Sequence, residues 1–143
     1  MITTLTEQVY FKGCNTPSTA IVDGDFPASG SFLDVSDTLR FGFIIHAGGS
    51  DTALTCQVQQ AATVSGTPKN VTDAVQTISA TGDGTVYLIE VETRKLDLNN
   101  GYNYVTLDVS GQAGSNDTLA IIFWSIPRVA PVTQTNTAVI VAG

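Results

Sequence analysis

The alternation of hydrophobic and polar residues between Thr38 and Ala62 is the clearest structural signal in the chain. In its first part the hydrophobic residues recur at every second position: Leu39, Phe41, Phe43, Ile45 and Ala47. In its second part Leu54, Cys56 and Val58 alternate with polar residues. Successive side chains of a strand point to opposite faces, so both parts are predicted to be half-buried strands. Gly48 and Gly49 between them can adopt the positive φ of a tight turn, and the stretch therefore predicts a β-hairpin.

Similar patterns separated by turn residues predict further strands and no amphipathic helix. The predicted strands cover residues 3–12, 19–22, 32–35, 85–93, 102–109 and 117–126, whereas residues 75–80 stay ambiguous. About eight strands at this spacing predict an all-β fold, an antiparallel β-sandwich of the jelly-roll type. An immunoglobulin-like sandwich is the alternative, but the two cysteines and the tryptophan do not follow its Cys…Trp…Cys order.

Two segments do not fit a simple sandwich. In the predicted strand from Leu119 to Ile126, hydrophobic residues occur on both faces, so both faces must be covered by other parts of the structure. The cover is either a loop or a neighbouring subunit, with Trp124 as the anchor of the interface in the second case. Beyond Arg128 no charged residue remains, and we predict that residues 1–126 form the sandwich and residues 127–143 an extended C-terminal arm. Its hydrophobic end, with Val139, Ile140 and Val141, either returns as an edge strand or, as we favour, contacts a neighbouring subunit.

The charge content argues against several partners. Charged residues make up 13% of the 143 residues, the net charge is −7, and the six basic residues are scattered. Nucleic acid requires a clustered positive field, and an anionic membrane surface requires the same, so neither is predicted as a partner. The N-terminus lacks the pattern of a signal peptide, which predicts synthesis in a cytoplasm, where Cys14 and Cys56 are expected as free thiols.

Candidate catalytic residues are few, and we predict no enzyme, no cofactor and no metal. His46 is the only histidine and is accompanied by no catalytic motif. Glu90 and Glu92 share one strand face, whereas glycosidase carboxylates flank a bond within a cleft. Asp23 and Asp25 lack the further acidic positions of a calcium loop.

Polar and aromatic residues on the predicted strands offer binding surfaces instead. Thr55, Gln57 and Gln59 form an uncharged strip suited to contact with another protein. Tyr102 and Tyr104 share a strand face, where they either stack on a sugar ring or cover a sheet or a partner.

Four segments carry a resemblance to a known family: Phe32–Ser36, Leu39–Gly48, Thr55–Ala61 and Gly101–Leu107. Over about residues 30–130 the succession of strands and turns resembles jelly-roll cement or decoration proteins that stabilise the heads of tailed bacteriophages. The resemblance implies a virion protein on the outer capsid surface, made in the host cytoplasm and acting without a cofactor. It also implies two partners, the major capsid protein and further copies of the chain in a homodimer or homotrimer. The alternative function is a receptor- or glycan-binding module of a phage tail or fibre that uses Tyr102, Tyr104 and Trp124.

Overall fold

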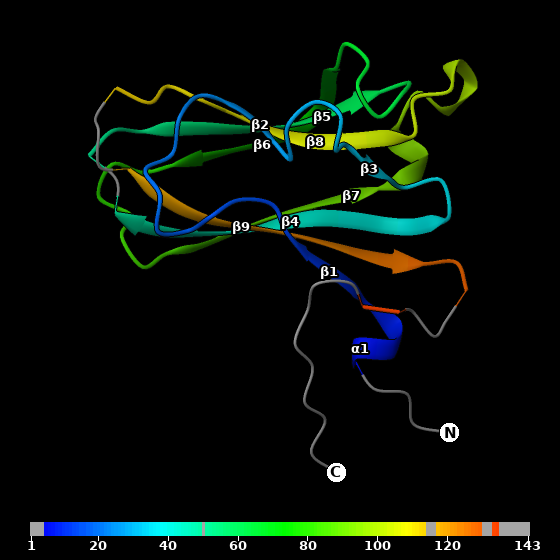
Figure 1. The fold of residues 1–143 in the computed structure, drawn as a ribbon, viewed down its shortest axis with the longest axis horizontal. Helices are drawn as coiled ribbons and strands as arrows, with labels where there is room; N and C mark the ends of the chain where they lie inside the picture. Colours follow the sequence, from blue (N-terminus) through cyan, green and yellow to red (C-terminus); the bar gives the residue numbers. More distant parts are fainter. Residues whose placement is uncertain (1–4, 50, 114–116, 130–132, 135–143) are drawn as a thin grey trace.

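The chain folds into two antiparallel sheets that pack face to face, as the ribbon in Figure 1 shows. The computed structural model describes residues 5–49, 51–113, 117–129 and 133–134. The elements are α1 (Leu5–Gln8), β1 (Tyr10–Gly13), β2 (Gly24–Phe26), β3 (Leu33–Asp34), β4 (Thr38–Gly49), β5 (Leu54–Ala61), β6 (Lys69–Ile78), β7 (Val86–Glu92), the 3-10 turns η1 (Thr93–Lys95) and η2 (Leu98–Asn100), β8 (Tyr104–Ser110) and β9 (Thr118–Pro127). The prediction of an all-β sandwich is confirmed.

The strand order is that of a jelly roll. One sheet, here called sheet A, has the order β1-β9-β4-β7, and the other, sheet B, has the order β2-β8-β5-β6 with β3 paired to β8. When β3 is set aside, the first strand of the chain pairs with the last strand, the second strand with the second to last, and so on inward. The pairs are β1 with β9, β2 with β8, β4 with β7, and β5 with β6. Such nested pairs describe one long antiparallel ribbon rolled into two sheets.

Aromatic and aliphatic side chains from both sheets fill the space between the layers. Phe41, Phe43 and Phe123 of sheet A are at most 2% exposed, and the rings of Phe43 and Phe123 are 5.6 Å apart. From sheet B, Val58 and Leu107 face them and are fully buried. The inward residues are those that the period-two pattern predicts, because alternation along a strand decides which side chains reach the core. The exception is Leu39, which the pattern places inward but which is 50% exposed, since the register of β4 against β9 shifts between Thr38 and Arg40.

The prediction of a hairpin between Thr38 and Ala62 is wrong, although both strands exist. The strand β4 pairs with β7 and β9 in sheet A, and β5 pairs with β6 and β8 in sheet B, so the chain crosses between the layers after Gly49. Gly48 and Gly49 belong to β4, and Gly49 lies opposite Thr118 of β9. The carboxylate of Asp117 holds the crossing segment, because it accepts hydrogen bonds from the Asp51 amide (2.6 Å) and the Thr52 hydroxyl (2.7 Å).

Two further predictions are corrected at element boundaries, and one open assignment is resolved. Residues 5–8 form the short helix α1, and the first strand begins only at Tyr10. No strand covers residues 19–22, whereas part of the predicted turn that follows forms β2. Residues 75–78 of the ambiguous stretch belong to β6, which begins at Lys69 and forms the true hairpin with β5. The predicted arm at 127–143 lies for the most part outside the described residues, so the proposed domain boundary stays a prediction.

Candidate functional site

The outer face of sheet A carries a group of exposed and half-buried hydrophobic side chains. Its centre is Trp124 of β9, which lies directly opposite Gly42 of β4. A Cβ atom at position 42 would lie 2.9 Å from Cζ2 of Trp124 and 1.9 Å from the carbonyl oxygen of Ile89. Glycine at this position therefore leaves the space that the indole occupies beside the neighbouring strand.

Side chains from four elements surround the indole and form a shallow cavity of about 280 Å³. The lining residues are Leu5, Val9, Phe11, Ile44, Leu88, Glu90 and Trp124. Leu5 on α1 and Leu88 on β7 are 64% and 65% exposed. We call this set the Trp124 face. A hydrophobic surface with an aromatic residue at its centre is typical of a protein contact.

The outer face of β9, for which the sequence predicts a cover by a loop or by a neighbouring subunit, is partly open in the structure. Leu119, Ile121 and Phe123 point into the core, whereas Ile122, Trp124 and Ile126 lie half-buried on the outer face. The helix α1 contributes Leu5 to the cavity that Trp124 lines, but Leu5 itself is exposed. The strand is therefore only partly covered within the described residues.

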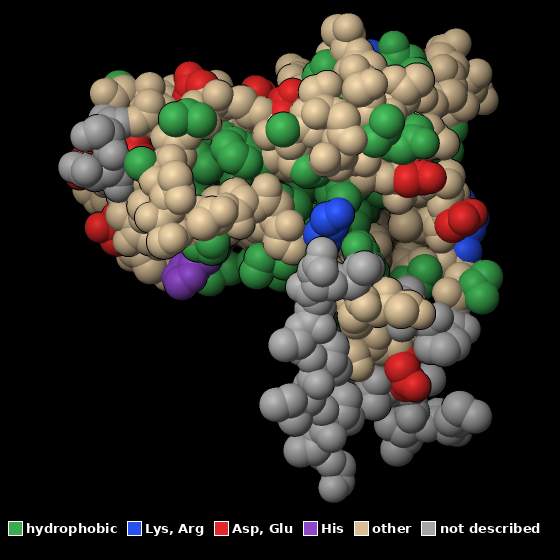
Figure 2. All heavy atoms as spheres, viewed as in Figure 1, with side chains coloured by type: hydrophobic (Ala, Val, Ile, Leu, Met, Phe, Trp, Pro, Cys, Tyr) green, Lys and Arg blue, Asp and Glu red, His purple; other side chains and the backbone are tan. Residues whose placement is uncertain are grey.

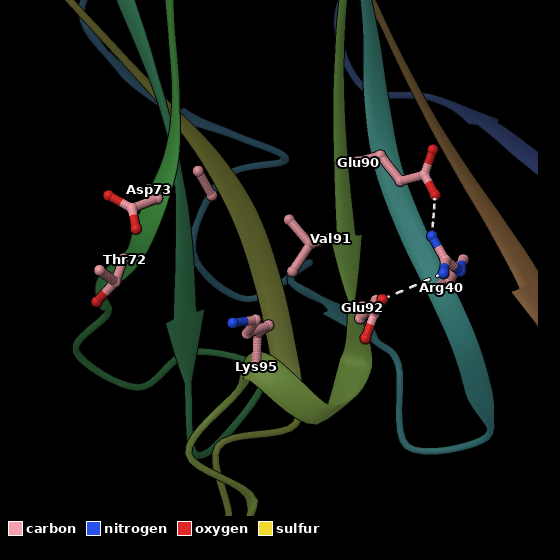
Figure 3. A pocket seen from close by; sticks show the side chains of 8 residues that line it. Arg40, Thr72, Asp73, Glu90, Val91, Glu92 and Lys95 are labelled. Atoms are coloured by element: carbon pink, nitrogen blue, oxygen red, sulfur yellow. Dashed lines mark hydrogen bonds and ion pairs between the residues drawn. The ribbon is translucent and has the colours of Figure 1, made fainter.

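Charged side chains border this face at the end of β7. The guanidinium of Arg40 donates to Glu90 (2.5 Å) and to Glu92 (3.1 Å), and Arg94 donates to the second oxygen of Glu92. Figure 3 shows Glu90 and Glu92 on β7, with Arg40 of the neighbouring β4 placed between their carboxylates. The hydrogen bond from Arg94 and the charges of Arg94 and Arg40 lower the pKa of Glu92. The two glutamates that the sequence singled out are thus bound to arginine side chains.

A second, polar cavity of about 340 Å³ lies between β6 and β7, which are edge strands of sheet B and sheet A. On one side β6 leaves its pairing with β5, and Asp73 there has a φ of 61°. Figure 3 shows Thr72 and Asp73 on β6, Val91 pointing into the gap, and Lys95 below it. The cavity contains both charge signs and no cluster of three metal-ligating side chains within the described residues.

The predicted strip of Thr55, Gln57 and Gln59 lies on the outer face of sheet B, on the far side of the sandwich from Trp124. Thr55 is exposed, and Gln59 donates to the side chain of Asn70 on β6 (3.0 Å). Gln57 is directed toward the irregular part of β6, where its amide nitrogen donates to the carbonyls of Val71 (2.9 Å) and Ala74 (3.1 Å). Gln57 therefore stabilises the distorted strand, and only part of the strip offers its polar groups to a partner.

The three aromatic residues of the glycan-binding hypothesis do not lie together. Tyr104 belongs to β8 and faces outward from sheet B, whereas Trp124 lies on the outer face of sheet A. Tyr102 is half-buried, and the ammonium group of Lys69 lies 3.9 Å from the centre of its ring. Any sugar site built from these residues would use the tyrosines without Trp124.

The remaining candidates of the sequence have separate positions. His46, purple in Figure 2, is exposed on the surface of sheet A. Cys14 and Cys56 are both free thiols, as predicted. Asp25 lies opposite Asp108 on β8. Val139, Ile140 and Val141 lie outside the described residues.

Sequence reasoning found Trp124 but missed the residues that complete its face, chiefly Phe11 and Leu88. A signal for Leu88 exists in the sequence. Val86, Leu88 and Glu90 are two positions apart and so share the outward face of the strand, and two of these three residues are hydrophobic. No local signal identifies Phe11, since only the pairing of β1 with β9 places it opposite Trp124.

No family model, no curated protein and no solved structure matches this chain. Among the described residues, no helix is both long and hydrophobic enough to cross a membrane.

Proposed function

We propose that the protein is a structural assembly protein that binds the surface of another protein through its Trp124 face. The observation that carries this proposal is the exposed hydrophobic ring around Trp124, with Leu5 and Leu88 each about two-thirds exposed. At about 25 cal/mol for each Å² of hydrophobic surface removed from water, a partner that covers such side chains gains substantial affinity.

The sequence resemblance supplies the identity of the partner. It supports a virion protein that binds the outer surface of a phage head and connects neighbouring major capsid subunits. A ligand that binds only the assembled shell stabilises that shell in proportion to occupancy, and many copies with small contacts add avidity. The jelly-roll fold is compatible with this role, because viral capsid proteins use it. The same fold also occurs in lectin domains, so the fold by itself does not distinguish a capsid role from sugar binding.

Two matched variants test the proposal. In Leu88→Asp a charge is placed on the Trp124 face, and in Val75→Asp the same change is made on the outer face of sheet B, where Val75 is 49% exposed. Both positions are exposed, so both variants should fold with unchanged urea midpoints. Heads assembled without the protein are mixed with each variant and sedimented.

The expected result is that wild type and Val75→Asp sediment with the heads, whereas Leu88→Asp stays in the supernatant. Loss of binding in Val75→Asp alone would indicate that the contact with the heads is made by sheet B, with its strip of Thr55, Gln57 and Gln59. Wild-type protein that does not bind heads at all would refute the assignment to a phage head.

A further inference from the structure

The C-terminal segment of the described chain ends beside the Trp124 face. Gln134, the last described residue, holds this end through three hydrogen bonds of its side-chain amide. The amide oxygen accepts from the Phe11 backbone nitrogen (3.1 Å), and the amide nitrogen donates to the carbonyls of Thr6 (2.9 Å) and Val9 (2.7 Å). Since Val9 and Phe11 also line the cavity, the chain is held at its rim.

The nine residues that follow have the chemistry of this face. Residues 135–143 contain no charged side chain, and Ala138, Val139, Ile140, Val141 and Ala142 form a continuous hydrophobic run. Glu90 is the one charged residue that lines the cavity, and its carboxylate is already bound by Arg40. An uncharged segment can cover the cavity without leaving a charge unpaired.

The distances also fit. An extended chain advances roughly 3.3–3.6 Å per residue, so the four residues from Gln134 to Ala138 can span at most about 14 Å. Strands in a sheet are about 4.8 Å apart, so the three intervals from β1 to β7 span roughly 14 Å. The tether from Gln134 is therefore long enough for the hydrophobic run to reach across the Trp124 face.

We propose that residues 138–142 bind the Trp124 face of their own chain. The short tether from Gln134 gives the segment an effective concentration in the millimolar range, far above that of a second copy in dilute solution. The segment covers Trp124 and Leu88 and removes the exposed hydrophobic surface from water.

One consequence rests on the proposed function. If the Trp124 face is the docking surface, the segment is a latch that the partner must displace. The apparent affinity for the partner is then lower than the intrinsic affinity by the fraction of molecules in which the latch is open.

Trp124 is the only tryptophan, so its fluorescence reports on this face alone. The test variant is Ile140→Asp in the full chain, and the control is Val129→Asp, which changes a residue that is 79% exposed upstream of the Gln134 anchor. In Ile140→Asp the emission should shift to longer wavelength and acrylamide quenching should increase, equally in dilute and in concentrated protein. The control should match wild type.

Identical emission and quenching in Ile140→Asp and wild type would overturn the proposal. A difference that appears only in concentrated protein would also overturn it and identify a second copy as the source of the segment. Sedimentation with heads separates this inference from the proposed function. A latch predicts stronger binding by Ile140→Asp than by wild type, whereas absence of binding by both proteins refutes the docking role and leaves the fluorescence result valid.

Discussion

At the scale of single residues, position 42 is the glycine site with the least space for a side chain in the described structure. The indole occupies the space that a side chain at position 42 would need, and the Ile89 carbonyl closes the same space from the other strand. We expect Gly42→Ala to lower the free energy of unfolding by about 1–3 kcal/mol or more, since an overpacked site forces neighbouring groups to move. Urea denaturation followed by Trp124 fluorescence measures the change.

Gly13→Ala is the matched control for this substitution. Gly13 also lies in a strand of sheet A, but a Cβ atom there would meet nothing within 4 Å. The control should change stability by no more than about 0.5 kcal/mol. Equal effects of the two substitutions would show that the cost arises from strand propensity and that Trp124 does not lie against position 42.

At the scale of paired elements, β2 and β8 contain an unfavourable pair of carboxylates. Asp25 lies directly opposite Asp108, and both are partly buried. Burial and the charge of Asp108 raise the pKa of Asp25, and burial and the charge of Asp23 raise the pKa of Asp108. Like charges in opposite positions of an antiparallel pair destabilise it.

This pair predicts a stabilising substitution that depends on pH. At pH 7, Asp25→Asn should raise the free energy of unfolding by a few tenths to about 1 kcal/mol, the small value reflecting the exposure of the pair. A carboxyl whose pKa is raised in the folded state binds more protons folded than unfolded, so wild type gains stability from this pair as the pH falls through that raised pKa. The advantage of the variant should therefore shrink toward pH 4, as measured by urea titration at several pH values.

The exposed Asp37 supplies the control, because Asp37→Asn removes the same charge far from β2. An equal gain in Asp37→Asn would mean that net charge, and not the pairing with Asp108, is responsible. A gain that does not decrease between pH 7 and pH 4 would contradict the assigned cause.

The elements also show how much of the fold the sequence determines locally. Alternation predicted the strands around Phe43, Ile89 and Leu107 because burial on one face leaves a period of two. It did not predict the partners of these strands. The glycines at 48 and 49 have the local properties of a turn, but β4 gains pairing with β9 through Gly49, and Asp117 fixes the crossing from far along the chain.

The candidate site divides in the same way. Trp124 was accessible from the sequence because its strand is hydrophobic on both faces, which is a local property. Phe11 becomes part of the same face only through the pairing of β1 with β9. Gln57 has the sequence pattern of an exposed contact residue, but the irregular stretch of β6 directs its amide to backbone carbonyls, and nothing in the neighbouring sequence shows this.

At the scale of the whole molecule, the two thiols report on different ways in which the sandwich opens. Cys56 lies in the core between the sheets and is fully buried, whereas Cys14 follows β1 and lines a cavity of about 320 Å³ at the surface. Burial raises the pKa of Cys14 to about 11 and that of Cys56 to about 12. The thiolate is the reactive form, so at pH 8 both folded thiols should react slowly.

The two rates should respond differently to denaturant, because Cys14 needs only a local opening of the segment after β1, whereas Cys56 needs separation of the two sheets. In Cys56→Ser, where Cys14 alone remains, labelling by a disulfide reagent should change little in low urea. In Cys14→Ser, labelling of Cys56 should accelerate with urea in parallel with the equilibrium population of unfolded protein. Rates that rise with urea to the same extent in both variants would mean that Cys14 also reacts only after global unfolding. The segment after β1 would then belong to the same cooperative unit as the core, and the Trp124 face beside it would rest on a single rigid sandwich.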